Sequence, residues 1–228
     1  AILEACRDIQ TQLAGLVAAH YDLNVSEVAV EDGMVLLPDY EMGITRAVGI
    51  ALGRLGGEII GNGEIRVEGD PEHPLGGRAV FYEFNCAACE LEVDEETGEI
   101  HIARYVTVGD VGRALNPAQV EGQDEGAAIM GLGHSLMERM VLDGSGRILN
   151  MGAVDYRILT AMDVPDQLVS ANVENADGPG PYGIKGVSEA SLLATAPAVA
   201  AAVTSATGVV IRDLPITPER IWMAKKGL

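Results

Sequence analysis

Bulky aromatic side chains are scarce in this sequence. It has two phenylalanines and one tryptophan among 228 residues, but 28 glycines. Large rings therefore cannot dominate the core, and turns and close backbone contacts must be frequent. With 48% hydrophobic and 21% charged residues, the composition is typical of a globular protein with a real core. The length allows one large domain or two small ones.

Basic residues are also few. Fifteen lysines and arginines face 34 acidic residues, which gives a formal net charge of −19. Such a chain repels the phosphates of nucleic acids and anionic membrane surfaces, so we expect neither as a partner. The acidity has two interpretations: it keeps the protein soluble, or it forms a surface that docks a basic partner subunit.

Cysteine is too rare for a disulfide framework, because the sequence has only three. Cys86 and Cys89 form a C-x-x-C pair, but a zinc or iron–sulfur site needs a second pair, which Cys6 alone cannot supply. The pair lies in a strand-like run, so we interpret both residues as small buried core residues. The four histidines are too scattered for metal-ligand spacing, and His134, alone in a predicted helix, is interpreted as structural. We therefore expect no metal ligand in this sequence.

Long apolar runs and several signature motifs are missing as well. No run of 18 apolar residues occurs, so we expect no membrane-spanning segment. The sequence opens as a helix without an initiator methionine or a signal peptide, which favours a cytoplasmic protein cut from, or continuing, a larger one. Neither G-x-S-x-G nor G-x-x-x-x-G-K-[ST] is present, which argues against a serine hydrolase and an ordinary nucleoside triphosphate site.

The hydrophobic periodicity predicts interleaved helices and strands without a regular βαβ alternation, which favours an α+β fold. Helices are predicted over 1–20, 44–55, 117–140 and 190–207, and strands over 27–30, 34–37, 80–93, 99–108, 147–151 and 167–174. The tail 209–228 should hold one more short strand. We treat 1–228 as one region whose best internal boundary is the glycine-, proline- and charge-rich stretch 61–78, with one short strand at 64–68.

Two segments carry unusual residues. Four glycines, at 122, 126, 131 and 133, lie in one predicted helix, where each costs roughly 1 kcal/mol against alanine. They indicate either close approach by a ligand or tight packing against another element. The loop 178–189 (GPGPYGIKGVSE) ends with Glu189 just before an alanine-rich helix. That carboxylate either serves chemistry or only complements the helix dipole, a contribution of about 0.3–1 kcal/mol.

Several motifs stand in an order and at a spacing that resemble one family. They are residues 90–100 (ELEVDEETGEI), 110–117 (DVGRALNP), 122–133 (GQDEGAAIMGLG), 155–157 (DYR), 163–165 (DVP), 185–189 (KGVSE), 196–200 (APAVA) and 214–219 (LPITPE). The ordered set resembles the C-terminal part of the molybdopterin-binding large subunit of the xanthine dehydrogenase/aldehyde oxidase family of molybdenum hydroxylases. The resemblance covers nearly the whole chain, most firmly residues 88–222.

The resemblance implies roles for particular residues. It places Glu189 beside the molybdenum as the active-site base and Gln123 against the pterin of the cofactor. The loop at Lys185, Gly186, Val187 and Ser188 should line the same cavity. The family usually has a glycine where this sequence has Ser188, which either crowds the metal or adds a hydroxyl near it. We expect Glu189 to be buried enough to accept a proton near neutral pH.

The resemblance also implies an activity and partners. Such an enzyme hydroxylates an aromatic heterocycle or an aldehyde, with water as the oxygen source and with a molybdenum–molybdopterin cofactor. A bacterial split form would favour the cytosine dinucleotide form. The remaining molybdopterin-binding segment and the 2Fe-2S and FAD modules must reside on partner chains, so this chain alone should be inactive. Two alternatives stay open: a non-catalytic assembly or scaffold subunit, and an unrelated α+β binding domain.

Overall fold

The computed structural model describes residues 1–53, 56–69, 71–76 and 78–228. The chain divides into two compact units, Ala1–Glu68 and Gly69–Leu228. The division lies inside the stretch 61–78. Helices and sheets are mixed in both units, which agrees with the predicted α+β class.

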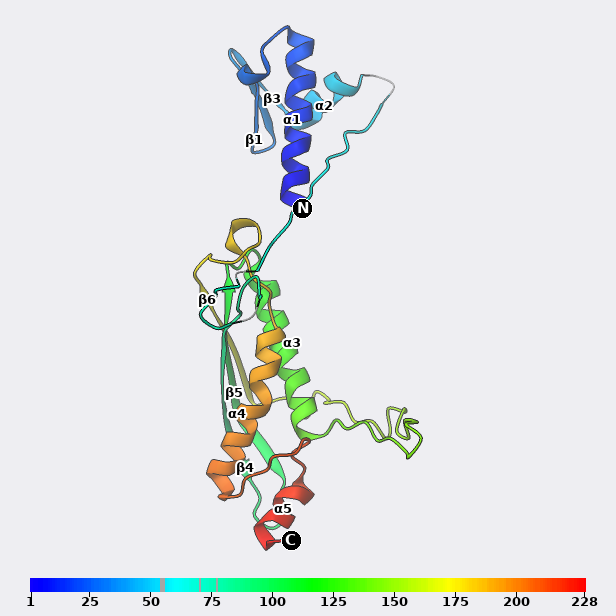
Figure 1. Ribbon diagram of the computed structural model, residues 1–228, viewed down its shortest axis with the longest axis vertical. Helices are drawn as coiled ribbons and strands as arrows, with labels where there is room; N and C mark the ends of the chain where they lie inside the picture. Colours follow the sequence, from blue (N-terminus) through cyan, green and yellow to red (C-terminus); the bar gives the residue numbers. More distant parts are fainter. Residues whose placement is uncertain (54–55, 70, 77) are drawn as a thin grey trace. The chain divides into compact units, whose positions relative to one another are not determined.

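The first unit packs two helices against a small antiparallel sheet (Figure 1). Its elements are α1 (Ile2–Tyr21), the 3-10 turn η1 (Val25–Glu27), β1 (Ala29–Glu31), β2 (Met34–Leu37), β3 (Tyr40–Gly43) and α2 (Ile44–Leu52). The strands pair in the order β1-β2-β3. The core is aliphatic: Leu13, Ala14, Val17, Ala18, Val28, Val35, Met42 and Ala47.

The predictions for this unit hold for most elements. The turn between β1 and β2 places Asp32 and Gly33 at φ 48° and 77°, as a tight hairpin turn requires. The strand β3 was missed, and the end predicted for α2 at residues 54–55 lies outside the described residues. The strand expected at 64–68 is absent, since these residues form no ladder in the described structure. The segment just before these residues lies along α1, because Asn62 N–H donates to Asp8 Oδ2 at 2.8 Å.

The second unit is a three-stranded sheet with two long helices on one face (Figure 1). β4 (Asn85–Val93) pairs antiparallel with β5 (Ile100–Gly112), which pairs in parallel with β6 (Gln167–Glu174). The helix α3 (Pro117–Leu136) connects β5 to β6, and α4 (Glu189–Thr207) packs against both α3 and β4. The main core cluster is Ile102, Tyr105, Ala128, Leu132, Val199, Val203, Ile216 and Ile221.

Both long helices begin where their sequences indicate. Asn116 caps α3, its side chain accepting from Gln119 N–H at 3.3 Å, and Pro117 takes the first helical position. In α4 every fourth residue is buried: Ser191, Thr195, Val199 and Val203. Pro197 lies inside this helix without splitting it, and Gly208 ends it at φ 74°.

By length and composition, α4 is the one helix in the described part of the chain that could cross a membrane. Its buried stripe faces the core of the second unit, where α4 contacts α3 and β4. The alanine-rich composition is therefore explained by close packing within this unit, because small side chains let the helix approach its neighbours.

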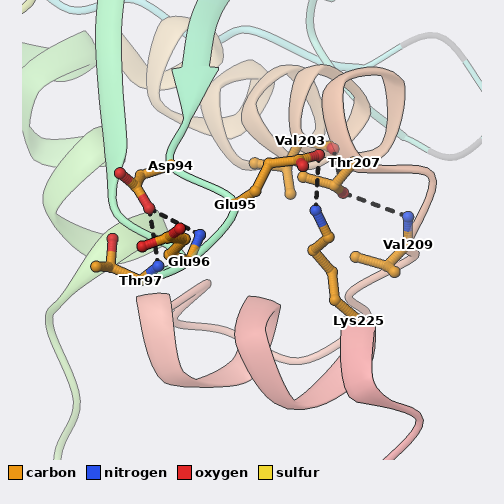
Figure 2. Close-up of polar contacts among 8 residues, drawn as sticks. All are labelled: Asp94, Glu95, Glu96, Thr97, Val203, Thr207, Val209 and Lys225. Carbon is orange, nitrogen blue, oxygen red and sulfur yellow. Dashed lines mark hydrogen bonds and ion pairs between the residues drawn. The ribbon is translucent and has the colours of Figure 1, made fainter.

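The turn between β4 and β5 docks against a short C-terminal helix, α5 (Pro218–Lys226). Figure 2 shows Asp94 accepting two backbone hydrogen bonds within the turn and Lys225 Nζ meeting Glu95 Oε1 at 2.9 Å. Gly98 has no room for a side chain, because a Cβ there would collide with the backbone of Pro218. Glu95 is 81% exposed, so this ion pair contributes little and the backbone contact does more to hold the turn.

Three predictions for this unit are wrong. Residues 147–151 form no strand, only an isolated bridge between Leu142 and Ile148. The tail holds α5 in place of the expected strand. Cys86 is exposed although we expected it in the core, whereas Cys89 is partly buried, and burial raises the pKa of its thiol to about 11. Strand side chains three residues apart point to opposite faces, so these two thiols do not face each other.

Candidate functional site

An open groove of about 600 Å³ lies where α3 passes the start of α4. It is lined from α3 by Gly122, Gln123, Gly126, Ala127 and Met130, and from α4 by Ser188, Glu189, Leu192 and Leu193. Gln123 and Glu189, far apart in sequence, therefore line one cavity. The mixture of an apolar wall with a few polar groups is typical of a small-molecule or cofactor site.

A smaller pocket of about 250 Å³ adjoins this groove at Gln123. Its lining includes Lys185 and Val187 from the loop before α4, together with Arg113 and Asn116. Within the described residues the Gln123 amide makes no hydrogen bond, so both its donor and its acceptor are free for a ligand. A primary amide is suited to pair with the alternating donors and acceptors of a pterin edge.

The helical glycines divide between the two interpretations offered by the sequence. A Cβ at Gly122 or Gly126 would meet nothing within 4 Å, and both residues line the groove. A Cβ at Gly131 would lie 2.5 Å from Thr195 Oγ1, so this glycine permits close packing of α3 on α4. The first two glycines leave space in the groove, and the third serves packing.

The side chain of Lys185 is engaged within the protein. Its Nζ lies 2.6 Å from Asp110 Oδ2 and 2.7 Å from Asp177 Oδ1, and its side chain is only 4% exposed. Burial would raise the pKa of Asp110, but hydrogen bonds from Lys185 and from Gly112 N–H outweigh it, so that pKa lies below its usual range. Burial likewise opposes the charge on Lys185, yet its two carboxylate partners raise the pKa of the ammonium. Lys185 thus anchors its loop and offers the pocket its backbone and side-chain stem.

Ser188 caps α4 in a conformation that favours glycine. Its φ is 85°, and its hydroxyl makes no capping hydrogen bond to the helix. In this left-handed conformation an L residue is strained, whereas glycine is not. Gly186 lines neither pocket; a Cβ there would lie 3.6 Å from the ring of Phe81 and 3.7 Å from Glu83 Oε2.

Glu189 is the first residue of α4, and its side chain is exposed in this chain. The burial expected from the sequence is thus not provided by the described residues of this chain. A second carboxyl, Glu83, comes from the segment before β4, and sequence reasoning missed it. Burial raises the pKa of Glu83 and the Ala190 N–H lowers it, while the charges of Asp124, Glu189 and Asp110 raise it further.

Asp124 is another residue that sequence reasoning missed. It follows Gln123 on α3, is 1% exposed, and accepts a hydrogen bond from Ser191 Oγ at 2.8 Å. An almost fully buried carboxyl is rare without a cation, and no pattern in the sequence indicated this burial, because it depends on tertiary packing.

Other candidates are less suited to chemistry. Another cavity, of about 730 Å³, is lined by the start of β5, residues 157–166 and residues 216–219, and none of the predicted site residues line it. Among the described residues no group of three or more His, Cys, Asp or Glu is arranged to hold a metal ion. His134 is exposed on α3. The groove at Gln123 and Glu189 therefore remains the best candidate.

Comparison with known proteins shows the family of this chain. A family model described as a molybdopterin cofactor-binding domain matches residues 1–165. The chain is 40% identical over 140 residues to the xanthine dehydrogenase molybdenum-binding subunit of Escherichia coli O157:H7, covering 61% of this chain and 18% of that subunit. It is 32% identical over 154 residues to the 6-hydroxypseudooxynicotine dehydrogenase complex subunit gamma of Paenarthrobacter nicotinovorans, covering 66% and 19% respectively.

A solved structure resembles nearly the whole chain. Quinoline 2-oxidoreductase from Pseudomonas putida 86 superposes with a TM-score of 0.68 at 26% identity, covering 96% of this chain and 28% of that one. The chain spans less than a fifth of the length of the two curated relatives, at 18% and 19%.

Proposed function

Because the chain belongs to the molybdenum-binding oxidoreductase family of xanthine dehydrogenase type, as part of the molybdopterin-binding large subunit, we propose that it supplies the base and one wall of the cofactor pocket. The base is Glu189. The substrate class is an aromatic heterocycle or an aldehyde, hydroxylated with oxygen from water. The observation that carries the proposal is the groove that joins the Gln123 amide to the Glu189 carboxylate.

The described residues fit a molybdopterin cofactor. The groove has space above Gly122 and Gly126, where a side chain would intrude, and the unpaired Gln123 amide faces it. When bound, the cofactor would supply the two-electron oxidation of the substrate.

In this proposal the residues of this chain hold the cofactor and orient it. We propose that Gln123 pairs with the pterin, and that Lys185, Val187 and Ser188, which line the two adjoining pockets, form their edge, whereas Gly186 lies outside both. Lys185 keeps this edge rigid through its two aspartate partners. Glu189, at the start of α4, accepts a proton at one carboxylate oxygen during turnover.

Parts of the protein outside this chain complete the site in this proposal. Glu189 is exposed here, so the remaining molybdopterin-binding segment must cover it and exclude water. Iron–sulfur and flavin partner chains would remove the electrons. The chain by itself is therefore inactive in this proposal.

The test is the substitution Glu189→Gln in the complete enzyme purified from its native host through a tag on this chain. The amide keeps the shape but cannot accept the proton, so kcat should fall by at least about a thousandfold while molybdenum content stays constant. The matched control is Glu121→Gln, an exposed carboxylate on α3 that does not line the groove, and it should leave kcat unchanged. Unchanged turnover in Glu189→Gln, with molybdenum present, would favour the non-catalytic scaffold alternative.

A further inference from the structure

Directly behind the groove, a chain of hydrogen bonds connects the sheet to both long helices. Asn85 Nδ2 on β4 donates to Thr107 Oγ1 on β5 at 3.1 Å and to Ser191 Oγ on α4 at 3.0 Å. Ser191 Oγ donates in turn to Asp124 Oδ1 on α3 at 2.8 Å. Thr107, Ser191 and Asp124 are 0%, 0% and 1% exposed, so water does not compete for these bonds.

Helix geometry relates this network to the groove. Gln123 and Asp124 are neighbours on α3, separated by roughly 100° around the helix axis, so one faces the groove and the other the sheet. Glu189 and Ser191 are separated by roughly 200° on α4, which likewise places them on opposite sides. The Ser191–Asp124 bond therefore joins the two helices at the turns that carry Glu189 and Gln123.

No cation among the described residues forms an ion pair with Asp124. Among the described residues, the buried side-chain atoms without a partner in hydrogen-bond geometry are Asp124 Oδ2, Ser170 Oγ and Asn172 Oδ1. Two of them converge at Gly109, where a Cβ would lie 3.8 Å from Asp124 Oδ2 and 3.6 Å from Asn172 Oδ1. An ionised carboxylate with one bare oxygen is costly in such a place, whereas a neutral carboxyl presents an O–H toward these acceptors.

Burial raises the pKa of Asp124, and the nearby hydroxyls of Ser191 and Ser170 lower it by less, so the balance moves toward the neutral form. Among the described residues of this region, the other acidic groups are Glu83, Asp110 and Glu189. The cations are Lys185, which already has two carboxylate partners, and Arg113, which lines the smaller pocket.

We propose that Asp124 is a positioning residue for Glu189, a neutral carboxyl that bridges α3, α4 and the sheet and fixes Glu189 relative to the cofactor wall at Gln123. The proposal rests on the proposed function of Glu189. Asp124 touches neither substrate nor cofactor. It acts by holding Ser191, and with it the first turn of α4.

The test compares Asp124→Asn with Asp124→Ala in the complete enzyme. Asparagine reproduces the neutral carboxyl: its oxygen accepts from Ser191 and its amide donates toward Asn172. It should keep kcat within about threefold of the wild type. Alanine leaves Ser191 without its acceptor and should let the first turn of α4 shift. Because a small displacement of a base slows the reaction strongly, kcat should fall by about tenfold to a hundredfold, with KM and molybdenum content unchanged. Asparagine as damaging as alanine, or alanine without effect on kcat, would overturn the proposal.

Ser191→Ala removes the same bond from the other helix and provides a second variant if Asp124→Ala does not fold. It should reproduce the kcat loss, and an unchanged kcat would refute the bridge. In a Glu189→Gln background, Asp124→Ala should cause no further loss, since a positioning residue acts only through its target. An additional tenfold loss there would show a separate, merely structural role.

One readout does not depend on activity. Infrared difference spectroscopy of the full chain at pH 7 should show the carbonyl stretch of a protonated carboxylic acid that disappears in Asp124→Asn. Its absence from the wild type would refute the neutral bridge. Failure of the proposed function would look different, because Glu189→Gln would then retain turnover whatever Asp124 does.

Discussion

The strain at Ser188 can be tested by a single substitution. Its φ of 85° costs an L residue about 1–2 kcal/mol, and glycine does not incur this cost. Ser188→Gly also makes the unfolded chain more flexible, which offsets roughly 0.5–1 kcal/mol. No capping hydrogen bond is lost, because the hydroxyl makes none. The net expectation is a stabilisation of about 0.5–1 kcal/mol.

The assay is equilibrium unfolding of the full chain, followed by circular dichroism against urea and temperature. For a unit of this size the gain corresponds to a rise in Tm of about 1–4 °C. Ser188→Ala is the matched control, since it removes the hydroxyl but keeps the strain, and its stability should stay within about 0.5 kcal/mol of the wild type. If alanine stabilised as much as glycine, or if glycine were neutral, backbone conformation would not be the cause. In the complete enzyme the same pair of variants separates crowding of the pocket from a role of the hydroxyl.

Two further predictions concern packing and charge. Lys185→Met should destabilise the chain by about 2–3 kcal/mol at pH 7 in urea titrations, because it leaves Asp110 nearly buried without its cation. The pKa of Asp110 is lowered, so the extra stability of the wild type over Lys185→Met should disappear as pH falls through that pKa. The pKa of Lys185 is raised, so the same extra stability should also disappear as pH rises through the ammonium pKa. A stability difference independent of pH would refute the ion pair as its source. Gly131→Ala should destabilise the chain by about 1–3 kcal/mol, because its Cβ would collide with Thr195. Gly122→Ala has open space around it and should stabilise α3 by up to about 1 kcal/mol. It should nevertheless reduce the molybdenum content of the complete enzyme, because the new side chain enters the groove. Equal effects of the two alanines on stability would contradict the packing interpretation.

Local signals predicted many elements of this fold. The Asn116-Pro117 start of α3, the Asp32-Gly33 hairpin turn and the end of α4 at Gly208 are each decided by residues within a few positions, so the sequence alone indicates them. The same reasoning failed for α5, although Thr217 caps it by accepting from Arg220 N–H at 3.3 Å. A helix this short is stabilised by tertiary contacts, namely Ile221 in the core cluster and Pro218 against the β4–β5 turn, which no local pattern records.

The candidate site shows the same division. The ordered motifs singled out Gln123 and Glu189, and the structure places both in one groove. Their pattern did not reveal that the Lys185 ammonium is already paired or that Glu189 is exposed in this chain. The pairing of Lys185 with Asp110 joins residues 75 positions apart, and sequence separation gives no distance in space.

By itself the sequence indicated the family, the α+β class, the starts of α3 and α4 and the end of α4, whereas α3 ends at Leu136 and not near residue 140 as predicted. It also singled out Gln123 and Glu189 for the chemistry, and their roles stay a prediction. Each of these follows from nearest-neighbour preferences or from motif order. Only the tertiary structure decided that Asp124 lies buried behind Gln123 and that Ser188 adopts a left-handed conformation. The reason is physical: burial and backbone conformation at a junction are set by packing of distant segments, and packing is a property of the whole chain.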